Sequence, residues 1–69
     1  MLAEERFSEI LKLVNEHKTI TVQELTELLD MSESTIRRDL TTLHKKGKLI
    51  KVHGGATAVN MAQYTRDES

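Results

Sequence analysis

Two helix-start signals separated by a short connection constrain this chain more than any other feature. Thr21 and Glu24 form a T-x-x-E capping box, in which each side chain bonds the backbone N–H of the other residue. Ser32 is a second good N-cap, because its hydroxyl accepts a hydrogen bond from an unpaired N–H of the first turn. Only residues 30–32 separate the two expected helices, and this spacing predicts a helix-turn-helix at about residues 20–39.

The helix after Ser32 is expected to bury one face and expose the other. Its apolar residues recur at i, i+4 and i+7, at Ile36, Leu40 and Leu43. The opposite face is polar and partly basic, with Ser34, Arg38, Thr41 and Lys45 at its centre, Arg37 on one flank, and Thr35 and Thr42 on the other. Hydroxyl and guanidinium groups near a helix N-terminus are typical of a major-groove reader. The alternative is an ordinary amphipathic helix with a solvated face.

The first two helices are predicted from the same periodicity. Residues 3–17 carry acidic side chains in the first turn, where the helix dipole favours them, and an apolar stripe of Phe7, Ile10, Leu11 and Val14. Residues 22–29 form the second helix, with inward-facing Val22, Leu25, Leu28 and Leu29. The core is therefore expected to be aliphatic and anchored by the single ring of Phe7. Met31 in the turn is interpreted as a plug for this core.

A change of pattern after the third helix predicts strands. That helix should end near Lys46, with Gly47 as the left-handed residue that closes it. Residues 49–53 and 56–59 read as two strands around a Gly54-Gly55 turn, although the register of the first strand is left open. Residues 19–21 are short and β-branched, as in a brief edge strand.

Three helices followed by a two-stranded hairpin make a mainly helical α+β domain, the winged helix-turn-helix. We expect it to span residues 1–59, with the wing at about residues 49–59. Residues 60–69 are polar and without periodicity, so we expect a tail or the start of a linker. The chain has no cysteine, which excludes a disulfide framework or a thiolate metal site.

Two separated motifs resemble the signature of the DeoR family of bacterial transcriptional regulators. They are the Ser-Glu-Ser-Thr-Ile-Arg-Arg-Asp-Leu run at 32–40 and, after Gly47, the Val-His-Gly-Gly-Ala run at 52–56. The resemblance covers about residues 3–59. It implies the operator-binding domain of a regulator, mostly a repressor of sugar-metabolism operons in that family. It also implies a homo-oligomeric parent protein whose effector domain, absent from this chain, senses a phosphorylated sugar.

The distribution of charge is consistent with a DNA partner, although the net charge of the chain is only −1. Residues 1–30 carry three basic and seven acidic side chains, a net charge of −4. Residues 31–56 carry six basic and two acidic side chains, a net charge of +4. Such a separation gives the domain one face that attracts backbone phosphates.

Roles for individual residues follow from their expected positions. The candidates for base edges are Ser34, Arg38 and Thr41, and those for phosphates on the same helix are Ser32, Thr35, Arg37 and Lys45. The start of the second helix, at Thr21 and Gln23, offers backbone N–H groups to a phosphate. On the wing, Lys51 and His53 are placed to touch the backbone or the minor groove. We expect Asp39 to avoid phosphates by pairing with Arg37, Arg38 or a lysine.

Each of these residues also has a simpler interpretation. Arg37 and Arg38 can be a solvated basic face, and the lysines at 45, 46 and 48 can serve solubility alone. His53 can be a turn residue of the hairpin, and Thr21 purely a cap.

Other functional classes fit the sequence less well. No Ser/His/Asp set shares an evident pocket, and His17, His44 and His53 lack ligand spacing, so neither an enzyme nor a metal or cofactor site is expected. Single-strand RNA readers usually offer stacking aromatics, of which this chain has almost none. The serious alternative is a winged helix that binds protein through its acidic first helix. No apolar run approaches the roughly 20 residues that cross a bilayer, and no signal peptide is evident, so a cytoplasmic location is expected.

Overall fold

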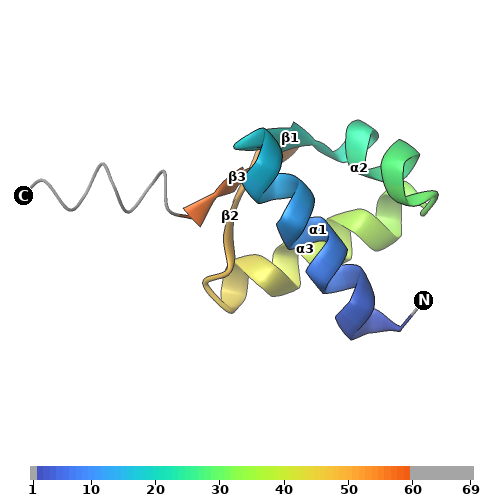
Figure 1. The fold of residues 1–69 in the computed structure, drawn as a ribbon, viewed down its shortest axis with the longest axis horizontal. Helices are drawn as coiled ribbons and strands as arrows, with labels where there is room; N and C mark the ends of the chain where they lie inside the picture. The colour runs from blue at the N-terminus through green and yellow to red at the C-terminus, as the bar shows by residue number, and fades with distance from the viewer. Residues whose placement is uncertain (1, 60–69) are drawn as a thin grey trace, which may run out of the picture.

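The computed structural model describes residues 2–59. Its elements, in chain order, are α1 (Ala3–His17), β1 (Thr19–Thr21), α2 (Val22–Leu29), α3 (Glu33–Lys45), β2 (Leu49–Val52) and β3 (Gly55–Ala58). Three helices lie beside a small antiparallel sheet, as Figure 1 shows. The predicted winged helix-turn-helix is therefore confirmed. The expected tail at residues 60–69 lies outside the described residues.

Local hydrogen bonds account for where α2 and α3 begin. The Thr21 N–H donates to Oε1 of Glu24 at 3.1 Å, and the Glu24 N–H donates to Oγ1 of Thr21 at 3.0 Å. This reciprocal pair is the predicted capping box. At α3 the Thr35 N–H donates to Oγ of Ser32 at 3.3 Å, so Ser32 is the N-cap as expected.

Left-handed residues account for where the helices end. Asp30 closes α2 with a φ of 56°, and Gly47 follows α3 with a φ of 74°. Asparagine, aspartate and glycine tolerate this region best, which explains why the turn between α2 and α3 can be so short. The helix α3 ends at Lys45, one residue before the predicted end.

The sheet has the order β1-β3-β2, with β3 in the centre. β1 at residues 19–21 was predicted as a brief edge strand, and it pairs with β3 through Ile20 opposite Ala56. The register that the sequence left open places Leu49 opposite Ala58. Because paired residues share a face of a sheet, the buried side chains Leu49, Ala58, Ala56 and Ile20 all face the helices.

The predicted Gly54-Gly55 turn is wrong by one residue. Val52 pairs with Gly55, so the two turn residues are His53 and Gly54, and Gly54 supplies the positive φ of 79°. Gly55 lies in β3, where a Cβ atom would approach the Ile20 carbonyl oxygen to 2.2 Å. Its role is thus to allow close approach of β1, not to form the turn.

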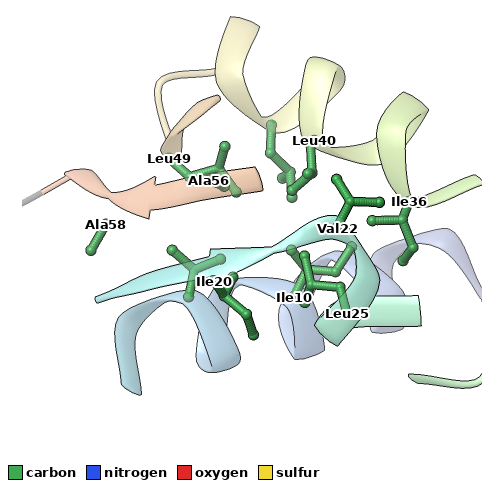
Figure 2. Close-up of a cluster of buried hydrophobic side chains, with 11 residues drawn as sticks. Ile10, Ile20, Val22, Leu25, Ile36, Leu40, Leu49, Ala56 and Ala58 are labelled. Atoms are coloured by element: carbon green, nitrogen blue, oxygen red, sulfur yellow. The ribbon is translucent and has the colours of Figure 1, made fainter. Parts of the chain in front are cut away.

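The core is aliphatic, as expected. Figure 2 shows Ile36 and Leu40 of α3 on one side of the core and Ile10 and Leu25 on the other; all four side chains are fully buried. Phe7 packs only at the edge of this cluster and is partly exposed, so it is not the central anchor that the sequence suggested.

Leu28 was predicted to face inward, and this prediction is wrong. Its exposed fraction is 56%, whereas Leu25 on the same helix is fully buried. At about 100° per residue, Leu28 lies at the edge of the stripe that Val22, Leu25 and Leu29 form. Because α2 packs against the core on one side only, a side chain at that edge remains in solvent.

Candidate nucleic-acid interface

The polar face of α3 lies opposite a fully buried stripe. Ile36 and Leu40 are 0% exposed and Leu43 is 2% exposed, so this side of the helix is closed against the core. On the other side the predicted base-edge candidates Ser34 and Arg38 are exposed, as is Lys45, and Thr41 is half-buried. The Thr41 hydroxyl donates to the Arg37 carbonyl oxygen at 3.0 Å, so it faces outward only as an acceptor.

A cluster of hydroxyl groups caps the first turn of α3. The Ser32 hydroxyl lies 2.9 Å from Oγ1 of Thr35 and 3.4 Å from Oγ of Ser34, in addition to its backbone bond. These side chains stabilise the start of the helix and also hold three hydroxyls together at its exposed end. Ser32 and Ser34 are exposed, and Thr35 is half-buried.

The two adjacent arginines have different surroundings. The Nε and Nη2 atoms of Arg37 both donate to Oε2 of Glu33, at 3.1 and 2.5 Å, across one turn of the helix. Arg38 is exposed and forms no ion pair with any residue from 2 to 59. Sequence reasoning gave Glu33 no role, although the i, i+4 spacing from Glu33 to Arg37 is a recognisable signal for such a pair.

Asp39 does not pair with Arg37, Arg38 or a lysine, so that prediction is wrong. The Nε of Arg6 on α1 donates to its Oδ2, and the Nη2 of Arg6 donates to its Oδ1 at 3.1 Å. Asp39 precedes Leu40 and is only 3% exposed, because it lies on the side of α3 that faces the body of the domain. The hydrogen bond to Asp39 raises the pKa of the Arg6 guanidinium above its ordinary value. The carboxylate is thereby kept away from any partner of the polar face.

The start of α2 offers fewer free donors than the sequence suggested. The Val22 N–H donates to the Gly54 carbonyl oxygen at 2.9 Å, and the Glu24 N–H donates to the Thr21 hydroxyl. The Gln23 N–H, between them, has no acceptor among residues 2–59 and could meet a phosphate, and the Gln23 side chain is exposed. The Val22–Gly54 bond also joins the wing turn directly to α2.

The wing is fixed to α3 by a histidine that sequence reasoning left without a role. The Lys51 N–H of the edge strand β2 donates to Nδ1 of His44 at 3.1 Å. This bond ties β2 to the last turn of α3 and occupies an edge N–H that would otherwise be open. The side chains of Lys51 and His53 are both exposed, so the predicted wing residues are accessible.

Comparison with known proteins decides the family. A model described as the DeoR-like helix-turn-helix domain matches residues 6–62. The chain belongs to this family. The resemblance drawn from the two sequence motifs is therefore confirmed.

Curated relatives of this DeoR-type domain are similar over most of its length. The lactose phosphotransferase system repressor of Streptococcus mutans is 50% identical over 64 residues, which are 93% of this chain and 26% of that protein. The repressor of the same name in Staphylococcus aureus is 50% identical over 60 residues, 87% of this chain and 24% of the relative. An uncharacterised HTH-type transcriptional regulator of Bacillus subtilis, FruR, is 47% identical over 60 residues, with the same two shares.

The chain thus spans about a quarter of the length of the curated relatives it matches. No solved structure is a significant match. Within residues 2–59 of the DeoR-type domain, no helix is long and apolar enough to cross a membrane. The same residues contain no group of three or more histidine, aspartate or glutamate side chains that could hold a metal ion.

Proposed function

We propose that this DeoR-type domain recognises the operator DNA of a sugar-metabolism operon for a repressor, with α3 in the major groove. The observation that carries the proposal is the pairing of an exposed, hydroxyl-rich and basic face with a fully buried aliphatic stripe on one helix. The relatives named lactose phosphotransferase system repressors support the sugar-operon assignment. The alternative, protein binding through the acidic face of α1, is favoured by no feature as specific as the polar and basic face of α3.

We assign the candidate residues to base edges or to phosphates according to their positions. Arg38 forms no ion pair with a carboxylate from residues 2–59 and is the best candidate for a bidentate contact with guanine. Ser34 and Thr41 accompany it as candidates for base edges. The phosphate contacts fall to residues around this centre, namely Ser32, Thr35, Arg37 and Lys45, together with Thr21 and Gln23 at the start of α2. Lys51 and His53 would contact the backbone or the minor groove from the wing.

The proposal extends to the whole regulator. The DNA-binding unit is residues 1–59, and residues 60–69 begin a connection to an effector domain outside this chain. That domain would bind a phosphorylated sugar and join two or more copies in the cytoplasm. Paired copies would read two half-sites, since a single helix-turn-helix covers only one.

Salt-dependent DNA binding tests the proposal. The 69-residue chain is used to enrich duplexes from a random-sequence pool, and the affinity of an enriched duplex is compared with that of a scrambled one by fluorescence anisotropy. The enriched duplex should bind more tightly, and log K should fall with log[salt] at a slope of about −0.9 per phosphate contacted. Failure to enrich any sequence, or affinity that is unchanged in molar salt, would overturn it.

A further inference from the structure

We infer that Glu33 is a specificity-determining residue that accepts a hydrogen bond from the N4 amino group of a cytosine in the operator. The inference rests on the proposed function, because it requires that α3 enters the major groove. It concerns the ion pair between Glu33 and Arg37, which lies at the start of that helix.

The geometry of the pair leaves one carboxylate oxygen available. Two nitrogens of Arg37, Nε and Nη2, donate to the same oxygen, Oε2 of Glu33. No residue from 2 to 59 donates a hydrogen bond to Oε1. The side chain of Glu33 is 61% exposed, so Oε1 is accessible from solvent while the arginine fixes the position of the carboxylate.

The position of Glu33 along α3 fits base contact. It is the first residue of the helix, and recognition helices present their N-terminal residues to base edges. In the major groove only cytosine and adenine present an amino donor. A glutamate pairs better with cytosine N4, because the N7 of adenine beside its amino group is an acceptor that would repel the carboxylate.

A purely stabilising role explains the pair less well. An exposed i, i+4 ion pair contributes little to folding, because both groups are well solvated when apart. A carboxylate on a helix that meets phosphates also weakens binding to DNA of any sequence. That repulsion is offset only on a sequence that gives the carboxylate a donor. Glu33 therefore favours one sequence and disfavours the rest.

The experiment compares Glu33→Ala with Glu9→Ala, which removes the same charge from an exposed position on α1. A duplex enriched by the wild-type chain is altered one C·G pair at a time, and each affinity is measured by fluorescence anisotropy. For the wild type, one C·G replacement should weaken binding by about tenfold or more. For Glu33→Ala that replacement should have no effect, whereas the scrambled duplex should bind more tightly than it does to the wild type. Glu9→Ala should keep every base preference.

Two results would overturn the inference while leaving the proposed function intact. In the first, Glu33→Ala tightens binding to every duplex equally, so that Glu33 only repels phosphates. In the second, Glu33→Ala weakens all duplexes equally and lowers the melting temperature, so that its role is to stabilise α3. If the wild type enriches no sequence at all, the proposed function itself fails and the inference falls with it.

Discussion

Arg6 on α1 and Asp39 on α3 form a two-point ion pair, with Nη2 of Arg6 3.1 Å from Oδ1 of Asp39 and Nε directed at Oδ2. The two residues are 33 positions apart in the chain. Asp39 follows directly after the two arginines of α3, yet it is only 3% exposed and its carboxylate points into the domain. The pair therefore ties the orientation of α3 to α1.

Removing one partner of this buried ion pair should lower the melting temperature more than removing one partner of an exposed ion pair. Arg6→Met leaves the buried Asp39 carboxylate without its two hydrogen bonds, so the melting temperature should fall clearly. The control is Arg37→Met, which breaks an exposed pair and should change the melting temperature little. The double variant Arg6→Met/Asp39→Leu should lose less than the sum of the single variants. Additive losses would show that the two side chains do not depend on each other.

Truncating a buried leucine should lower the free energy of unfolding far more than truncating an exposed one. Leu40→Ala removes a fully buried side chain and should lower the free energy of unfolding by about 2–5 kcal/mol. Leu28→Ala, at a position that is 56% exposed, should change it by about 0.5 kcal/mol or less. Urea denaturation followed by circular dichroism gives both values. Equal losses would contradict the orientation of α2 described above.

Alanine substitutions at Gly47, which follows α3, and at Gly55, which lies in β3, should lower the thermal stability by different amounts. At Gly55 the added Cβ would lie 2.2 Å from a backbone oxygen of β1, so the strands must separate or shift. At Gly47 an added Cβ would meet no atom within 4 Å beyond its chain neighbours, so only the left-handed conformation is penalised, by about 1–2 kcal/mol. Thermal denaturation should show the larger loss for Gly55→Ala. The reverse order would contradict the three-stranded arrangement at Gly55.

Arg38 and Lys45 should contribute to DNA binding in different ways. Arg38→Ala should cost about 1–3 kcal/mol on an enriched duplex and relax the preference at one base pair, if the guanidinium reads guanine. Lys45→Ala should weaken enriched and scrambled duplexes alike and reduce the salt slope by about one. Both variants are compared by anisotropy on the two duplexes. Equal losses for Arg38→Ala on both would remove it from base readout.

The helices were predicted well because capping and periodicity depend on residues only a few positions apart. The capping box at Thr21, the N-cap at Ser32 and the left-handed Gly47 each involve neighbours at most four positions away. The buried stripe of α3 is likewise a matter of spacing along one helix. The same rules failed at the wing turn, because the place of Gly55 is decided by β1, which lies far from it in the chain.

The sequence by itself determined the helices, the short turn between the second and third, and the basic, hydroxyl-rich face on the latter, because periodicity and capping are local properties. Only the tertiary structure decided that Asp39 pairs with Arg6, that Leu28 stays in solvent, and that His44 holds the Lys51 N–H. These outcomes depend on how separate elements pack. The angle and distance between two elements are set by the whole core, and no short stretch of sequence carries that information.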